Sequence, residues 1–252
     1  QLSTGRVGIS FAAGWQPTDF LLRPEAFAER KARMAEDVET VRRLWRGEAV
    51  RFDGPRGPVE VRTRPRPVQP ELPVFVTAAG NPETFALAGR LGAGVLTHLL
   101  GQRLEELERK LAVYREAFRA AGRPGEGHVT VMLHAFVGPD ADEVRGHVRA
   151  PMKAYLRSSL GLIREDAWAF PAFRRRADAD ASLADNFARL SPEDEDALLE
   201  HAFARYFETS GLFGTPAACA ATVEACRAIG VDEIGCLVDF GLAADVVLAH
   251  LP

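Results

Sequence analysis

Cysteine is scarce in this chain of 252 residues, which contains only Cys219, Cys226 and Cys236. The number is odd and no Cys-x-x-Cys pair is present. Disulfide frameworks and zinc sites need regularly spaced cysteines, so the sequence predicts neither a disulfide nor a metal site. Packing on a shared helix face explains Cys219 and Cys226. This cysteine usage fits a reducing, cytoplasmic compartment.

Long apolar runs and basic blocks are also missing. No stretch reaches the ~20 apolar residues that cross a bilayer, and no signal peptide is visible. The formal net charge is −4 and the pI is about 5.9, which is the wrong sign for a protein that binds nucleic acid. We therefore expect neither a membrane nor a nucleic acid as partner.

Hydrophobic residues make up 47% of the chain and charged residues 26%, as in ordinary globular domains. Helical and strand patterns alternate along much of it. We expect strands at 6–13, 72–78, 94–98, 129–137 and 233–240, and helices at 23–47, 82–91, 104–121, 216–229 and 243–250. This alternation predicts a parallel sheet with helices outside it, in a single α/β domain over residues 1–252.

Two segments depart from this rhythm. Residues 50–52 and 59–62 flank the turn sequence DGPRGP, so residues 50–62 predict a hairpin. Residues 138–210 are charged, aromatic and mostly helical, and we interpret them as an insertion before the last strand. Five strands are fewer than a (β/α)8 barrel needs, so either the sheet is open or three strands precede Gln1.

The stretch TAAGNPETF, residues 77–85, follows the apolar strand LPVFV and begins a helix. Gly80 lets a ligand approach the backbone, Asn81 and Thr84 supply polar side chains, and Pro82 stands where no N–H is needed. The first turn of a helix attracts anions, so this loop could hold a phosphate. A plain turn with Asn81 as N-cap explains the same residues.

Several stretches resemble the flavin-dependent luciferase-like monooxygenases. They are LSTGRVGISFAAGW, RKARMAEDVETVRRLWRG, RPRPVQPELPVFVTAAGNPETFALAGRLGAGVLTHLLG, LFGTP and GVDEIGCLVDFG. The likeness is strongest to the MupA type, found beside polyketide and nonribosomal-peptide synthases. It implies a TIM-type (β/α)8 barrel whose first three strands are absent from this chain.

The resemblance also implies a cofactor site for FMN at the carboxyl ends of the strands. We expect its cofactor-binding residues to be Ser10, Ala13, Thr77, Ala79, Gly80, Asn81 and Thr84. Related luciferases carry a phosphate-binding arginine near the place of Ala13, so here the loop at 80–84 is expected to hold the phosphate. His98, at the end of a short strand, is the candidate catalytic residue, and a structural role explains it equally well.

For the substrate pocket we expect Trp15, Trp168 and Phe170, the last two in a lid over the active site. A rim aromatic packed on a helix is the alternative for Trp15, and a helical cap with a solvated charged face is the alternative for the insertion. The function implied is an FMN-dependent monooxygenase that hydroxylates an organic intermediate, small or carrier-bound, with reduced flavin and O2. A flavin reductase and a second copy of the chain are the expected partners. A flavin-binding protein without turnover, or an oxidoreductase that uses F420, are the alternatives.

Overall fold

The structure of the protein is a computed structural model that describes residues 2–15, 17–158 and 183–250. The chain divides into two units. Unit 1 comprises residues 1–97 and 110–129, and unit 2 comprises residues 98–109 and 130–252.

The sheet of unit 1 is parallel, with β4 (Val74–Thr77) in its centre. One neighbour is β1 (Ile9–Phe11), in register Ile9 with Val74, and the other is β5 (Gly94–His98), in register Phe75 with Gly94. Strands β4 and β5 run in the same direction because helix α2 (Pro82–Arg90) connects them as a crossover. All three strands therefore present their carboxyl ends at one edge.

Helix α1 (Ala26–Arg46) follows β1 and the short 3-10 helix η1 (Pro17–Phe20). It ends where Gly47 takes a left-handed φ of 82°, which favours glycine. The Arg42 guanidinium donates hydrogen bonds to the carbonyl oxygens of Leu91 (2.7 Å) and Gly92 (3.2 Å) beyond the end of α2. A cation suits this negative end of the helix dipole, so Arg42 fastens α1 to α2.

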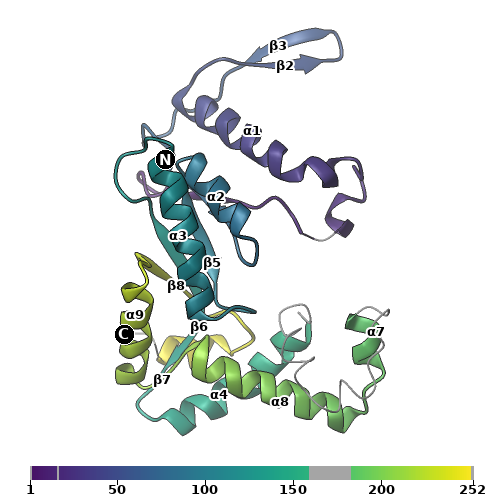
Figure 1. Ribbon diagram of the computed structural model, residues 1–252, viewed down its shortest axis with the longest axis vertical. Helices are drawn as coiled ribbons and strands as arrows, with labels where there is room; N and C mark the ends of the chain where they lie inside the picture. Colours follow the sequence, from purple (N-terminus) through teal and green to yellow (C-terminus); the bar gives the residue numbers. More distant parts are fainter. Residues whose placement is uncertain (1, 16, 159–182, 251–252) are drawn as a thin grey trace. The chain divides into compact units, whose positions relative to one another are not determined.

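After α1 the chain forms an antiparallel hairpin of β2 (Val50–Gly54) and β3 (Gly57–Val61), which extends from the rest of unit 1 in Figure 1. The hairpin was predicted from residues 50–62, and it is confirmed.

Helix α3 (Leu104–Ala120) packs closely on α2 through its residues in unit 1. A Cβ atom on Gly89 of α2 would lie 2.6 Å from the Tyr114 carbonyl oxygen and 2.7 Å from the Phe118 nitrogen. Tyr114 is fully buried, and its hydroxyl donates to the Ala93 carbonyl (2.9 Å) and accepts from the His128 N–H (3.0 Å). The missing side chain of Gly89 thus sets the distance between the two helices.

Unit 2 is organised around β6 (Val129–Val137), the longest strand of the described sheet. It pairs in parallel with β7 (Leu212–Gly214) and with β8 (Glu233–Leu237), where His134 stands opposite Leu237. Its helices are α4 (Ala141–Ser158), α7 (Leu183–Ala188), α8 (Pro192–Thr209), α9 (Pro216–Ala228) and α10 (Ala244–Ala249).

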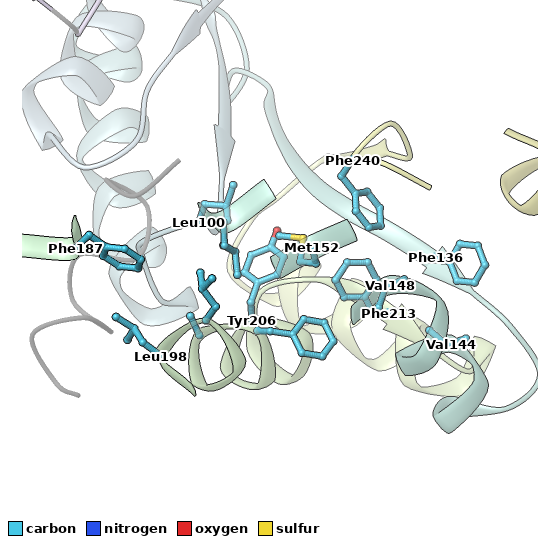
Figure 2. Close-up of a cluster of buried hydrophobic side chains, with 14 residues drawn as sticks. Leu100, Phe136, Val144, Val148, Met152, Phe187, Leu198, Tyr206, Phe213 and Phe240 are labelled. Atoms are coloured by element: carbon cyan, nitrogen blue, oxygen red, sulfur yellow. The ribbon is translucent and has the colours of Figure 1, made fainter. Parts of the chain in front are cut away.

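An apolar core joins α4 and α8 to β6 and β7 in unit 2, and Figure 2 shows its side chains converging. Ion pairs cover the exposed side of the same helix pair, because Lys153 of α4 lies 2.6 Å from Asp196 and 3.1 Å from Glu200 of α8. The core consists of Leu100, Phe136, Val144, Val148, Met152, Leu156, Phe187, Leu198, Leu199, Ala202, Phe203, Tyr206, Phe213 and Phe240.

The predicted parallel α/β architecture is confirmed, with two differences. The strand expected at 6–13 is reduced to Ile9–Phe11, and β7 was not expected at all because it is only three residues long. The described residues supply six parallel strands, fewer than a (β/α)8 barrel has. Within 138–210, the described parts are helical, as predicted for the insertion. No described helix is long and apolar enough to span a membrane.

We predict that Gly89→Ala destabilises the protein, although alanine is the better helix former. The added methyl group would collide with the backbone of α3, and such overpacking costs about 1–3 kcal/mol. Gly146→Ala in α4 is the matched control, because a Cβ there meets nothing within 4 Å. We expect the control to be neutral or to stabilise by up to about 1 kcal/mol. Urea unfolding monitored by circular dichroism measures both, and equal stabilisation would contradict the close packing.

Candidate functional site

Three consecutive backbone N–H groups follow the end of β4. Among the described residues, those of Ala79, Gly80 and Asn81 have no hydrogen-bond partner, whereas the Ala78 N–H donates to the Leu96 carbonyl (3.0 Å). Gly80 and Asn81 are exposed and Ala79 is half-buried. A Cβ on Gly80 would meet nothing within 4 Å. The loop therefore presents a row of donors with open space before it, which suits an anion.

The first N–H groups of α2 already donate hydrogen bonds within the protein. The Asn81 side-chain oxygen accepts from the Glu83 N–H (2.9 Å), and the Asn81 carbonyl accepts from the Thr84 N–H (3.0 Å). Asn81 is thus the N-cap, as one of the two sequence interpretations held. The donors at Glu83 and Thr84 are occupied, so an anion would meet the loop amides that precede the helix and the Asn81 side-chain NH2.

Two further predicted residues meet at this edge. The Ser10 and Thr77 hydroxyls are 2.8 Å apart, joining the ends of β1 and β4. Ser10 is exposed, so its hydroxyl is within reach of a ligand. The structure thereby brings together Ser10, Thr77, Ala79, Gly80 and Asn81, and it leaves Thr84 half-buried behind the cap.

A cavity of about 220 Å³ lies beyond the end of β1. Arg30 and Arg33 of α1 reach it from one side, and Asp37 adds one carboxylate. Its lining comprises Phe11, Ala12, Ala13, Phe20, Ala26, Arg30, Arg33, Met34 and Asp37. Ala13, expected at the cofactor, is therefore next to cationic side chains that the sequence interpretation overlooked.

The two arginines of this cavity differ in their contacts. Arg30 donates to the Phe27 carbonyl (2.6 Å) and the Gly14 carbonyl (3.2 Å), and its guanidinium lies 4.1 Å from the centre of the Phe27 ring. Arg33 forms no hydrogen bond or ion pair with any residue that the structure describes. Arg30 is thus held in place, and all the donors of Arg33 are available to a ligand.

A larger cavity of about 620 Å³ is less suited to binding an anionic ligand. Its lining, which includes Leu44, Trp45, Pro65 and Pro67, is mostly apolar, and Arg66 is its only ionisable member. The residues that line it either precede β1 or β4 in the chain or belong to the second half of α1. Sites in parallel α/β folds form at the opposite, carboxyl ends of the strands, so we assign the site to the edge where the loop at 79–81 follows β4 and the smaller cavity follows β1.

The residues expected for the substrate pocket are only partly described. Trp15 is 72% exposed in the loop after β1, next to Gly14, whose φ of 82° is left-handed. Leu21 and Leu22 in the same loop are also exposed. Trp168 and Phe170 lie outside the described residues.

Unit 2 has its own polar group near the carboxyl ends of β6 and β8. His134 is 2% exposed, and its Nδ1 lies 2.8 Å from the Tyr206 hydroxyl of α8. The pKa of His134 is lowered from 6.5 to about 4, mainly because the side chain is buried. The nearby carboxyl group of Asp239 raises this pKa, and the nearby imidazole of His98 lowers it. His98, the candidate catalytic residue, thus lies near His134.

Among the residues that the structure describes, no group of three or more His, Cys, Asp or Glu side chains is arranged to hold a metal ion. Cys219 and Cys226 are buried in unit 2, and burial raises the pKa of both thiols.

Comparison with known proteins identifies the class. The family profile described as luciferase-like monooxygenase matches residues 1–233, and the chain belongs to this family. Members of the family are oxidoreductases or monooxygenases that depend on a flavin or on F420.

Individual relatives are similar over parts of their length. The F420-dependent glucose-6-phosphate dehydrogenase of Mycobacterium leprae is 31% identical over 150 residues, which is 59% of this chain and 43% of that protein. The chain thus spans less than half the length of the curated relatives that it matches first.

Solved structures share the fold. The monooxygenase RslO1 of Streptomyces bottropensis has a TM-score of 0.59 at 24% identity, over 99% of this chain and 69% of that one. The oxygenating constituent of 3,6-diketocamphane monooxygenase of Pseudomonas putida, in complex with FMN, has a TM-score of 0.63 at 18% identity. The match covers 93% of this chain and 65% of that one.

We predict that His134 makes the protein less stable in acid. The folded state keeps His134 neutral down to about pH 4, whereas an unfolded chain takes up the proton near 6.5. Stability is therefore complete above about pH 6.5 and falls as the pH decreases, by roughly 2 kcal/mol between about pH 7 and pH 5. The groups facing His134 are His98, Tyr155, Tyr206 and Asp239.

The measurement is urea unfolding at both pH values for the wild type and for His134→Gln, which cannot titrate. The difference between the two proteins isolates His134 from the carboxylates that also titrate in acid. An identical pH dependence in both would show that His134 has an ordinary pKa.

Proposed function

We propose that the chain is the FMN-binding part of a flavin-dependent monooxygenase, which acts on an organic natural-product intermediate, either free or carrier-bound. One observation carries the proposal: three adjacent N–H groups at Ala79, Gly80 and Asn81, after the carboxyl end of β4, have no hydrogen-bond partner within the described part of the chain. Family membership makes a phosphorylated, tricyclic cofactor the ligand that explains them.

The residues present fit such a cofactor. Its phosphate would be held by the loop amides at 79–81, and Arg33 of α1, which lines the cavity after the adjacent strand β1, would supply the counter-charge. Charge-assisted hydrogen bonds of this kind are among the strongest that proteins make. Glu83, the nearest carboxylate on α2, is paired with Arg90 (2.5 Å), so its repulsion of an anion is reduced. The small side chains of Ala12, Ala13 and Ala79 leave room for a flat ring.

Reduced flavin, when bound, supplies the two electrons with which O2 is activated. This chain's own residues bind and orient it and exclude water. Exposed Trp15, Leu21 and Leu22 are apolar groups that can cover a ligand at the end of β1. A flavin reductase, a second copy of the chain and membership of the MupA type remain proposals that follow from the family resemblance.

A second candidate is an oxidoreductase that uses F420. It is favoured by the curated relatives with 31–39% identity, several of which are F420-dependent glucose-6-phosphate dehydrogenases. F420 carries its phosphate as a diester with one charge, whereas the terminal phosphate of FMN approaches two. Both cofactors carry a phosphate group, so their relative affinities decide between the two candidates.

We predict that Gly80→Glu weakens FMN binding roughly tenfold or more, because it places a carboxylate beside the phosphate group held by the loop at 79–81. Gly80→Gln adds almost the same volume without charge and is the matched control. A side chain at this position meets no atom within 4 Å of its Cβ, so both variants should fold. Flavin fluorescence titration measures the affinities. Equal affinities of the two variants for FMN would contradict a phosphate-binding site at this loop.

We also predict that Arg33→Gln weakens FMN binding by about tenfold, as expected when one charge-assisted hydrogen bond is lost. Arg109→Gln on the exposed side of α3 is the control and should leave the affinity unchanged. The wild type is titrated in parallel with F420. Tighter binding of F420 than of FMN would overturn the first candidate in favour of the second.

A further inference from the structure

The hairpin of β2 and β3 in unit 1 forms a small sheet of its own (Figure 1). Among the described residues, these two strands pair only with each other. One face of this sheet is apolar. Val50 at its base is buried, whereas Phe52, Val59 and Val61 on the same face are 42, 53 and 38% exposed. A two-stranded sheet is marginally stable in water, and further strands with an apolar face stabilise it.

The register of the hairpin determines which backbone groups face outward. Pro58 stands opposite Asp53, and a proline has no N–H with which to complete a hydrogen-bonded pair. Because bonded and non-bonded pairs alternate along an antiparallel ladder, Arg51, two residues before Asp53, also belongs to a non-bonded pair. Residues of non-bonded pairs direct their N–H and C=O groups away from the partner strand. Arg51 and Asp53 therefore present backbone donors and acceptors at the outer edge of β2.

The two outer edges of the hairpin differ in their protection. Pro58 removes a donor from the outer edge of β3, which is a common way to keep an edge strand from pairing. Strand β2 contains no proline, and Arg51, Phe52 and Asp53 are all exposed. The side chains of Arg51 and Asp53 form no ion pair or hydrogen bond with any residue that the structure describes. The outer edge of β2 is therefore the place where another strand can be added.

This edge is complementary to itself. Two β2 strands that run antiparallel about a twofold axis at Phe52 place Arg51 of each copy opposite Asp53 of the other. Each outward N–H then meets an outward C=O of the partner. Opposite charges in directly opposed positions stabilise a sheet, and like charges destabilise it. Moving the axis to Arg51 or to Asp53 would put like charges opposite each other, so the charges select the register centred on Phe52.

We propose that the outer edge of β2 is an interface between two copies of this chain, which join their hairpins into one continuous antiparallel sheet. The two Phe52 rings would form a non-bonded pair, in which side chains lie closest together. A twofold contact of this kind is closed, so it produces a dimer. Because each copy contributes only a short strand, the dimer should depend on concentration. This interface is independent of the proposed cofactor site, which contains no residue of the hairpin.

Sedimentation equilibrium of the full chain measures the association. The wild type is expected to change from the monomer of 27.5 kDa to a dimer as its concentration rises. Arg51→Asp puts two acids opposite each other in both cross-strand pairs, and it should raise the dissociation constant of the dimer roughly tenfold or more. Asp53→Arg should do the same with two arginines. The double variant, which exchanges the two charges, should restore the dimer.

The two single variants also control for each other. Mixed together, they should form a heterodimer, because the acids of one chain then face the arginines of the other. Both substitutions are at exposed positions, so circular dichroism should be unchanged in each. A wild type that stays monomeric at all concentrations would overturn the proposal. Single variants that associate as well as the wild type, or a mixture that does not associate, would overturn it too.

Disulfide formation tests which residue lies on the axis. Directly opposed residues of a non-bonded pair have Cα atoms about 4.5 Å apart, which a disulfide can bridge. In a Cys236→Ser background, which removes the exposed native cysteine, Phe52→Cys should form a covalent dimer on oxidation. Val59→Cys on β3 is the control and should not, because three strand spacings of about 4.8 Å would separate its two copies. Equal crosslinking at both positions, or none at Phe52→Cys, would overturn the proposed register.

Discussion

Three backbone donors without a hydrogen-bond partner among the described residues define the proposed cofactor site. The Ala79, Gly80 and Asn81 N–H groups follow a buried strand and precede a helix that caps itself. Unpaired N–H groups are costly when they are shielded from water, so such a row persists where solvent or a ligand satisfies it. Because Gly80 has no side chain and the space before it is open, a phosphate can approach the backbone of this loop closely.

The cap of α2 explains why the donors lie where they do. By accepting from Glu83 through its side chain and from Thr84 through its carbonyl, Asn81 satisfies the first donors of the helix. The interpretation as a capped turn and the interpretation as a phosphate seat are therefore compatible. The first describes the helix, and the second describes the loop before it.

Local features of the fold were predictable from the sequence. Gly47 ends α1 and the turn DGPRGP forms the hairpin, because each signal acts on neighbouring residues. The bounds of β6 were predicted as observed, since its apolar run is long and uninterrupted. Strand β7, with three residues, gives no periodic signal, and β1 is shorter than its apolar stretch.

The site was predictable only where it is continuous in sequence. The loop at 77–84 was found because its glycine, asparagine and proline are adjacent. Arg30 and Arg33 were missed, since they occupy exposed-looking positions of an amphipathic helix and only the packing of α1 brings them to Ala13. Likewise, Tyr206 is 72 residues from His134, and no local pattern connects a helix tyrosine with a strand histidine.

The most direct test observes the backbone donors themselves. In 1H–15N spectra of the labelled chain, FMN should shift the amide resonances of Ala79, Gly80 and Asn81 downfield, and riboflavin, which has no phosphate, should leave them nearly unchanged. If FMN binds and these three resonances do not move, or if riboflavin moves them equally, the phosphate is held elsewhere and the account is contradicted.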